Sequence, residues 1–282
     1  MINIVHSSLE AAQLQHLPHA VVAFSRDFDH DQLLATHSHP RGQLLYAAEG
    51  VMQVRTAHGL WVIPPQRALW VPCSLAHEIR MLSAVRLRTL YIRPHESELI
   101  GAECRLLEVS ALLRELILAL LKEESDSESG YDLRGRGGHL AQLILSEIDG
   151  AAAIPVVIPW PTDRRVVAVC EAILADPGNA NSLEHWAGFA GASPRTLIRL
   201  FPKETGLHFR HWVQQVHITD ALLRLSQGEA VERIAERLGY KSASAFTSMF
   251  RSVLGKTPSQ YGGLARRHIA ADSMLQRAKK IE

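Results

Sequence analysis

The sequence predicts an α+β protein of two domains, on three observations. Residues 1–100 consist of short apolar or alternating runs between turn signals, a pattern typical of a β-sandwich or small β-barrel. From about residue 104 onward, apolar residues recur every three or four positions, which indicates helices. Three prolines within residues 151–165 predict a linker between the domains, because proline is excluded from helix interiors.

Within the β region, turn residues at 49–50, 57–59 and 64–65 separate the expected strands, QLLYAA, VMQVRT, LWVI, ALWVP and VRLRTLYI. Two helices are then expected, over about residues 104–124 and 134–148. The first has one broad apolar face from Leu106 to Leu121, which must be buried against the β domain or a second subunit. We therefore interpret residues 101–150 as a helical dimerisation region of a homodimer.

Composition narrows the class of protein. The chain has 282 residues, of which 47% are hydrophobic and 21% charged, as in globular proteins. No apolar run approaches the roughly 18–20 residues that span a bilayer, and the N-terminus lacks the pattern of a signal peptide. The scattered Cys73, Cys104 and Cys170 suit free thiols in a reducing compartment. We expect a cytoplasmic protein with no membrane partner.

Charge is distributed unevenly along the chain. Residues 160–282 hold 17 Lys and Arg against 11 Asp and Glu, whereas residues 1–159 hold 13 against 18. The net charge of +1 for the whole chain conceals this difference. An excess of positive charge in the C-terminal part favours a polyanionic partner there.

The C-terminal part contains an internal repeat, in residues 183–206 and 231–255. Each copy predicts a short helix, a glycine-containing turn, a serine N-cap and a second helix, which is helix-turn-helix construction. A small alanine lets the two helices cross closely, and glycine permits a left-handed turn. The matched positions are Ala187 with Ala235, Gly191 with Gly239, and the expected N-caps Ser193 and Ser242.

The stretches SPRTLIRLFPKETG and ALLRLSQGEAVERIAERLGYKSASAFTSMFRSVLGKTPSQY resemble the AraC/XylS family of transcriptional regulators. For residues 166–270 the resemblance implies two helix-turn-helix units that place their second helices in successive major grooves of double-stranded promoter DNA. It also implies a joining helix at about residues 209–226, core positions Leu197, Leu200 and Phe201, and RNA polymerase as a further partner. A regulator of this kind works at the nucleoid.

The resemblance also implies which side chains contact DNA. Arg195 and Arg199 suit bidentate contact with guanine, worth about 1–3 kcal/mol of discrimination, or contact with phosphate; we expect one of them to contact a base. The second unit exposes no long bidentate side chain, so the first should supply most of the discrimination. The predicted DNA-binding residues are Arg195, Thr196, Arg199, Lys203, Lys241, Ser244, Thr247, Ser248 and Arg251.

Two positions depart from the family pattern. His217 stands on the joining helix where the family commonly carries arginine, so an ion pair of the family is expected to be missing. Pro202 removes a backbone donor late in the first recognition helix. We expect the helix to end or kink there and to leave Lys203 on a turn.

In the β region, the stretch THSHPRGQLLYAAEG places His37 and His39 on one face of an extended segment. It resembles the first signature of the cupin barrel, with Gln43 where a glutamate is usual and Gly50 in place. PCSLAH resembles the second signature and supplies His77, with Ser74 in place of a glycine. The resemblance implies a cupin-like β-barrel over residues 1–100 that senses an effector.

Two interpretations of the histidines stay open. His37, His39 and His77, with the Gln43 amide or water, have the donor set of a Zn²⁺, Ni²⁺ or Fe²⁺ site. Alternatively the histidines are pocket lining that hydrogen-bonds a small-molecule effector. The candidate effector-lining residues are Tyr46, Trp61, Trp70 and Tyr91; the histidines expected on the surface or in loops are His6, His16, His19, His30 and His58.

The sequence therefore predicts a ligand-responsive DNA-binding transcription factor. One alternative is a metal-dependent cupin enzyme fused to a DNA-binding domain, but the missing motif carboxylate argues against catalysis. The only carboxylates near the signatures, Glu49 and Glu78, look like solvated strand-end residues. A purely architectural DNA binder is a third alternative, in which residues 160–282 alone would bind and regulate like the whole chain.

Overall fold

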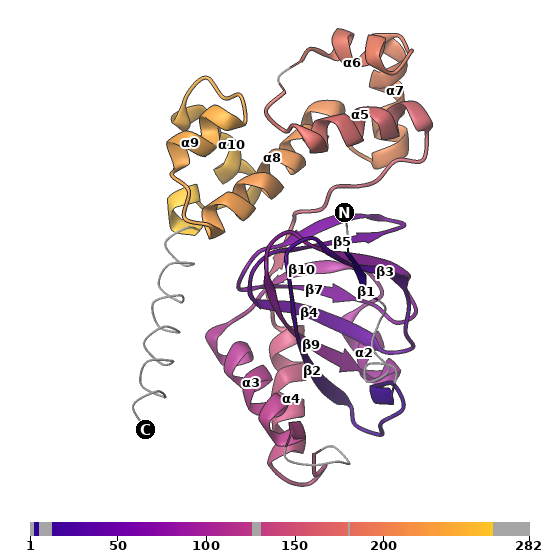
Figure 1. Ribbon diagram of the computed structural model, residues 1–282, viewed down its shortest axis with the longest axis vertical. Helices are drawn as coiled ribbons and strands as arrows, with labels where there is room; N and C mark the ends of the chain where they lie inside the picture. The colour runs from indigo at the N-terminus through magenta and orange to yellow at the C-terminus, as the bar shows by residue number, and fades with distance from the viewer. Residues whose placement is uncertain (1–2, 6–12, 126–130, 180, 262–282) are drawn as a thin grey trace. The chain divides into compact units, whose positions relative to one another are not determined.

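The computed structural model describes residues 3–5, 13–125, 131–179 and 181–261, and the chain divides into two compact units (Figure 1). The first unit comprises residues 1–57 and 61–155, and the second comprises residues 58–60 and 156–282. The main division falls inside the predicted linker. The first unit is rich in strands and the second is helical, which confirms the predicted two-domain α+β class.

Two sheets build the first unit, as its alternating sequence predicts. One has the strand order β1-β3-β8-β5-β6 and the other β11-β10-β7-β4-β9-β2. The strands are β1 (Asn3–Val5), β2 (Val21–Phe28), β3 (Gln32–His37), β4 (Gly42–Glu49), β5 (Met52–Thr56), β6 (Gly59–Ile63), β7 (Arg67–Val71), β8 (His77–Met81), β9 (Val85–Ile92), β10 (Arg105–Glu108) and β11 (Ala153–Ile154).

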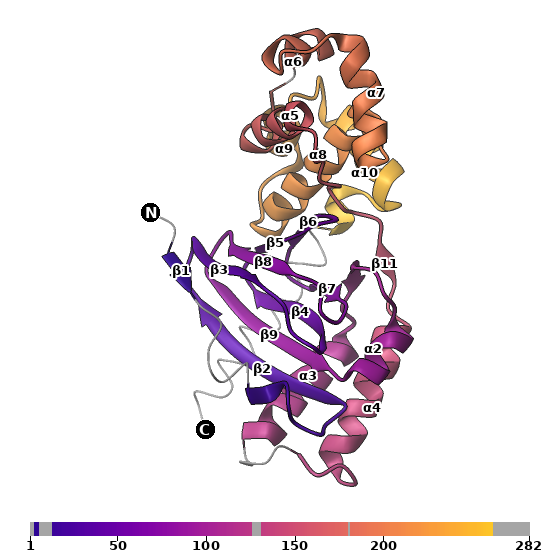
Figure 2. The ribbon, with the colours of Figure 1, turned by 90° about the vertical axis from the view of Figure 1, so that its right-hand side faces the viewer.

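Helices cover one face of the six-stranded sheet, as Figure 2 shows. They are α3 (Ala111–Ser125) and α4 (Arg136–Asp149), and a short helix α2 (Pro94–Ile100), which the sequence analysis did not predict, follows β9. Leu113, Leu116, Ile117 and Leu120 of α3 are buried in one core cluster with residues of β2, β4, β7 and β9. This cluster joins the helices to their own sheet.

Of the two alternatives for the apolar face from Leu106 to Leu121, burial against the β domain holds for these four leucine and isoleucine positions of α3. Leu106 and Leu107 lie in strand β10, where a period of two replaces the expected helical period, and the helix begins only at Ala111. The buried apolar side chains of α3 pack against the subunit's own sheet. An amphipathic helix buries its apolar face against the nearest apolar layer. Leu112 and Leu143 stay exposed on the helices.

The second unit is built from six helices among its described residues. They are α5 (Arg164–Ala175), α6 (Leu183–Phe189), α7 (Pro194–Thr205), α8 (Phe209–Ser226), α9 (Val231–Arg237) and α10 (Ala243–Leu254). Helices α6 and α7 form the first helix-turn-helix unit, α9 and α10 the second, and α8 joins them, with the bounds predicted for the joining helix (Figure 1).

Capping and turn chemistry follow the sequence prediction. The side chains of Ser193 and Ser242 accept hydrogen bonds from the backbone N–H groups of Thr196 and Ala245, so both serines are N-caps. Gly191 and Gly239 have φ of +62° and +74°, the left-handed region that glycine adopts without steric cost. Leu197, Leu200 and Phe201 are buried, as expected of the core face of α7; the full buried set of that core also includes Trp186, Trp212 and Val216.

The prediction that α7 ends at Pro202 and leaves Lys203 on a turn is wrong, because the helix continues to Thr205. Proline removes only the one hydrogen bond that its N–H would give to the carbonyl of Ile198. The side chain of Ile198 is 54% exposed, so water can reach this turn of the helix. Lys203 therefore lies in the last helical turn, where a cation complements the helix dipole.

The end of the linker is fastened to the first helix-turn-helix unit. The indole Nε1 of Trp212 donates a hydrogen bond to the carbonyl oxygen of Pro159, at a distance of 2.9 Å. The carboxylate of Glu204 accepts from the backbone N–H groups of Thr162 and Asp163, both over 3.0 Å. Among the described residues, no helix is long and apolar enough to cross a membrane.

Candidate functional site

The three predicted histidines meet in the first unit. His37 ends strand β3, His77 begins strand β8, and the two are register partners in the same sheet. His39 follows β3 on the loop to β4. One nitrogen from each ring lies within 4.8 Å of the others, and the ring centroids of His37 and His77 are 4.4 Å apart. Among the described residues, this is the group of His, Cys, Asp or Glu side chains arranged to hold a metal ion.

Backbone carbonyls fix the tautomer of all three rings. The Nδ1 atoms of His37, His39 and His77 lie 2.9, 2.6 and 2.9 Å from the carbonyl oxygens of residues 35, 41 and 75. A carbonyl oxygen only accepts, so each Nδ1 must carry the hydrogen. Each Nε2 is then left with a lone pair, which is the arrangement that orients histidines as metal ligands.

Burial favours the neutral form of His77 and His39. His77 is fully buried, and burial lowers its pKa to about 3 despite the opposing hydrogen bond to the Leu75 carbonyl. Burial also lowers the pKa of His39, although its bonds to Gln43 and to the Arg41 carbonyl oppose this shift. The Nε2 of His77 has no hydrogen-bond partner among the described residues. A buried, unpartnered lone pair is costly unless a ligand meets it.

Gln43 and Tyr91 complete the site from the opposite sheet. The side-chain oxygen of Gln43, in β4, lies 3.0 Å from Nε2 of His39. Both atoms hold lone pairs in this tautomer, so they form no hydrogen bond as placed; a cation between them, or the amide turned so that its nitrogen donates to Nε2, would satisfy both. The amide stands where the sequence predicted a fourth ligand. The ring of Tyr91, in β9, meets His39 edge-on at 5.2 Å between centroids. Burial raises the pKa of the Tyr91 phenol to about 12. Tyr91 is thus the predicted effector-lining aromatic that the structure brings to the histidines.

Tyr46 and Trp70 do not line this site, and their prediction as effector-lining residues is wrong. Both belong to the core cluster between the six-stranded sheet and helices α3 and α4. Side chains alternate along a strand, so the face that holds Gln43 and Tyr91 is the opposite one. The indole of Trp70 instead donates to the carbonyl of Gly101. Trp61 is buried in β6.

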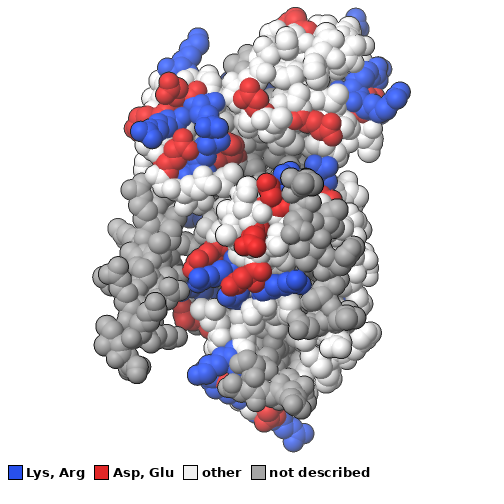
Figure 3. Space-filling view, in the orientation of Figure 1, with Lys and Arg blue, Asp and Glu red and all other residues white. Residues whose placement is uncertain are grey.

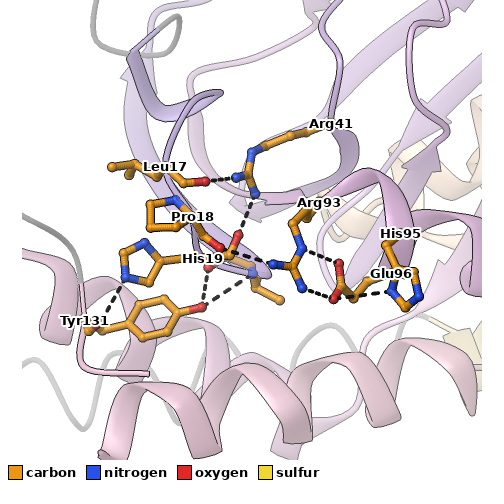
Figure 4. Close-up of polar contacts among 9 residues, drawn as sticks. Leu17, Pro18, His19, Arg41, Arg93, His95, Glu96 and Tyr131 are labelled. Carbon is orange, nitrogen blue, oxygen red and sulfur yellow. Dashed lines mark hydrogen bonds and ion pairs between the residues drawn. The ribbon is translucent and has the colours of Figure 1, made fainter. Parts of the chain in front are cut away.

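A buried arginine that the sequence analysis missed braces the loop next to His39. The guanidinium of Arg41 donates to the carbonyls of Gln15, Leu17 and His19, and so holds the segment before β2 in place. Figure 4 shows the contacts with Leu17 and His19. His19 lies in a loop, which is one of its two predicted placements, but it is buried, and its Nε2 lies 2.8 Å from the Tyr131 carbonyl. The signal for Arg41 was its position beside the His-x-His motif.

The first recognition helix, α7, presents its predicted side chains to solvent. Arg195 and Arg199 are exposed one turn apart, and within the described part of the chain neither is paired to a carboxylate. Thr196 is half-buried, and its hydroxyl lies 2.9 Å from that of Ser193 at the N-cap. Two free guanidinium groups on one face of a helix are suited to phosphates or guanine edges.

The second recognition helix, α10, differs in its chemistry. Ser244 and Ser248 are exposed and Thr247 is half-buried, while Lys241 and Arg251 are exposed on either side of them. On the face shown in Figure 3, Lys and Arg gather over α7, whereas over α9 and α10 they are mixed with Asp and Glu.

His217, where the family commonly carries an arginine, makes two hydrogen bonds. Its Nε2 lies 2.9 Å from the carbonyl of Pro177 and its Nδ1 lies 3.0 Å from the hydroxyl of Tyr240. Since the carbonyl only accepts, Nε2 carries the hydrogen and Nδ1 accepts from the tyrosine. Burial lowers the pKa of His217, partly offset by the Pro177 bond and by Asp220. This neutral ring links the loop after α5 to the second helix-turn-helix unit.

Comparison with known proteins agrees with both halves of this description. Residues 186–263 match the family described as a helix-turn-helix domain, and residues 19–141 match the AraC-like ligand binding domain. The HTH-type transcriptional regulator NimR of Escherichia coli (strain K12) is 34% identical over 243 residues, 86% of this chain and 87% of that protein. RipA of Corynebacterium glutamicum, also an HTH-type transcriptional regulator, is 33% identical over 103 residues, 36% of this chain and 31% of that protein.

Among solved structures, ToxT from Vibrio cholerae with a bound unsaturated fatty acid covers 86% of this chain and 94% of its own, with 14% identity and a TM-score of 0.35. The C-terminal domain of AraT from Geobacillus stearothermophilus covers 36% of this chain and 86% of its own, with 28% identity and a TM-score of 0.35.

Proposed function

The chain belongs to the AraC family of transcriptional regulators, and on that premise we propose that the histidine cluster is where its effector binds. A ligand-binding domain and a helix-turn-helix domain in one chain make the protein a ligand-responsive, DNA-binding transcription factor. The observation that carries the proposal is the fully buried, unpartnered Nε2 of His77 beside two further imidazoles of the same tautomer.

A divalent metal fits this donor set best. The Nε2 atoms of His37, His39 and His77 would hold it, with the Gln43 oxygen or water as a fourth ligand. Zn²⁺, Ni²⁺ and Fe²⁺ all accept imidazole ligands. A bound ion would take its ligands from β3, the loop that follows it, β8 and β4. The same lone pairs also suit an organic effector with hydrogen-bond donors, which is the alternative that the next experiment separates.

Elemental analysis of the untagged protein tests the metal site, beside His37→Ala and His77→Ala variants. His58→Ala, an exposed loop histidine, is the matched control. We expect about one equivalent of metal in the wild type and the control, and loss of it in both cluster variants. An absence of metal after exposure to Zn²⁺, Ni²⁺ and Fe²⁺ would contradict the metal site and leave the histidines as lining for an organic effector.

For DNA recognition we propose that one of Arg195 and Arg199 contacts a guanine edge and that the other contacts phosphate. Their exposure and freedom from carboxylate partners among the described residues support this assignment. The remaining proposed contacts, to phosphate or to thymine methyl groups, come from Thr196, Lys203, Lys241, Ser244, Thr247, Ser248 and Arg251.

We further propose a cytoplasmic homodimer that contacts RNA polymerase at the nucleoid and does not act as an enzyme. Exposed Leu112 and Leu143 on α3 and α4 support a dimer contact on the outer side of these helices. A catalytic site needs an acid or base near the cluster. Glu49 pairs instead with Arg86 over 3.0 Å at an exposed strand end, and Glu78 alternates with His77 and so faces away from it.

A further inference from the structure

A cavity of about 470 Å³ lies within the second unit, between its two helix-turn-helix units. One wall comes from the end of α5, the following loop and α6, and the other from the α9–α10 turn and α10. Helix α8 lies between these walls. The volume is in the range of about 300–1,000 Å³ that small-molecule sites occupy.

The lining combines apolar surface with positive charge. Its apolar side chains include Ile173, Trp186, Val213, Leu238 and Met249. Its charged side chains are the cations Arg210 and Lys241, and no carboxylate lines it. Neither cation forms an ion pair with any described residue, in contrast to Arg224 in the same helix α8, which pairs with Asp220 and Glu229.

Polar groups at one side of the cavity are arranged by His217. It lines the cavity and holds the Pro177 carbonyl on one wall and the Tyr240 hydroxyl on the other. Burial raises the pKa of Tyr240 to about 12, against the opposing charge of Arg210, which places the guanidinium near this phenol. Arg210 thus lies near the Tyr240 phenol, and Lys241, the next residue after Tyr240, lines the same cavity.

We propose that this cavity binds a small aromatic carboxylate, whose ring packs against Trp186 and Val213 and whose carboxylate pairs with Arg210 and Lys241. A DNA phosphate would use the two charges but leave the apolar lining without a partner. The proposed DNA contacts Ser244, Thr247 and Ser248 are also outside the lining. Charge and apolar surface together therefore favour an amphipathic organic anion.

Lys241 connects this site to DNA binding, a step that rests on the proposed function. The carboxylate would neutralise a charge that a DNA phosphate also uses. Binding of the anion and of DNA should therefore weaken each other by the same factor, because coupling between two ligands is reciprocal.

The test is calorimetric titration of the full chain with 2-naphthoate, beside 2-naphthalenemethanol as an uncharged probe of the same ring system. We expect saturable binding of 2-naphthoate, at least tenfold weaker binding of the alcohol, and at least tenfold weaker 2-naphthoate binding in Arg210→Gln. Arg210→Lys should restore most of the affinity, and Ala245→Trp should abolish binding by filling the cavity. Arg233→Gln, exposed on α9 outside the lining, is the control and should bind like the wild type.

Saturating 2-naphthoate should also raise the Kd for DNA at least threefold in the wild type and leave it unchanged in Ala245→Trp. No binding of 2-naphthoate, or equal binding by the wild type, Arg210→Gln and Ala245→Trp, would overturn the proposal. Binding that survives in those two variants but is lost in His77→Ala would also overturn it, and would assign the anion to the histidine cluster, so the two proposals fail separately.

Discussion

At the scale of single residues, hydrogen bonds decide which atoms are left for ligands. The carbonyls beside His37, His39 and His77 take the Nδ1 hydrogens and so leave three Nε2 lone pairs at the cluster. On α7 the reverse holds, since the guanidinium donors of Arg195 and Arg199 have no carboxylate partner within the described residues. The histidine cluster is therefore suited to a cation or a hydrogen-bond donor, and the exposed face of α7 is suited to an anion.

Substitution of the recognition residues should separate base contacts from phosphate contacts. Arg195→Ala or Arg199→Ala should relax specificity at one base pair by about 1–3 kcal/mol. Lys241→Ala should instead weaken binding to all sequences and lower the salt dependence by about one phosphate contact. Affinities for a selected site and its single-base variants, measured at several salt concentrations, check this. Equal losses on specific and random DNA for both arginines would contradict base contact.

Removal of the buried guanidinium of Arg41 should destabilise the first unit. Arg41→Met leaves the carbonyls of Gln15, Leu17 and His19 without a donor, and we expect a loss of about 3 kcal/mol in the free energy of unfolding. Denaturant titration measures the loss, and hydrogen exchange should rise in residues 15–19.

The matched control for this prediction is Arg93→Met. Arg93 pairs with Glu96 and donates to the carbonyl of Pro18, but its own side chain is 46% exposed, so water can replace it and we expect a smaller loss than for Arg41→Met. An Arg41→Met variant as stable as Arg93→Met would show that water replaces the guanidinium at the three carbonyls.

At the scale of elements, the helices of the second unit were the most predictable part of the chain. N-cap serines, turn glycines and a period of 3.6 all act within one turn, so Ser193, Gly191 and their counterparts marked these elements correctly. Strand β10 was mistaken for helix because Leu106 and Leu107 continue the apolar run of α3, and four residues are too few to show a period.

The candidate site was predictable only in part. The resemblance to the two cupin signatures placed His37, His39 and His77 together, and the structure brings their rings to one cluster. Whether Tyr46 and Trp70 face the histidines or the helices depends on which face of the sheet α3 and α4 cover. The sequence of a single strand does not determine this. The roles of Arg41 and His217 rest on contacts with carbonyls that are 22–26 and 40 residues away.

The link through His217 predicts a pH-dependent stability. Its pKa is below the unfolded value of about 6.5, so the unfolded state takes up the proton first. The contribution of His217 is therefore fully present above about pH 6.5 and is lost as pH falls toward its folded pKa.

The free energy of unfolding of the wild type should accordingly exceed that of His217→Gln by more at pH 7.5 than at pH 5.5. Chemical denaturation of both proteins at the two pH values measures this difference. A gap between the variants that stays constant, or widens in acid, would show that the folded state accommodates the charged ring.

At the scale of the whole molecule, the first unit carries the candidate effector site and the second carries the DNA-binding helices. The first unit holds a cluster of lone pairs, and the second carries the excess of positive charge. A regulator needs a coupling free energy between such sites, typically about 1–3 kcal/mol, or a change of 5–150-fold in affinity. Removal of residues 1–150 should therefore change regulation of a target promoter, whereas an architectural DNA binder would behave as before.

The measurement that tests the central claim most directly is the DNA affinity of the full chain with its histidine cluster loaded and stripped. DNA selected from a random pool by the wild type supplies the site, and Zn²⁺ or a chelator sets the state of the cluster. The account predicts at least a fivefold difference in Kd between the two states for the wild type, and none for His77→Ala. A wild-type protein that binds Zn²⁺ at the cluster yet has the same Kd in both states would contradict it.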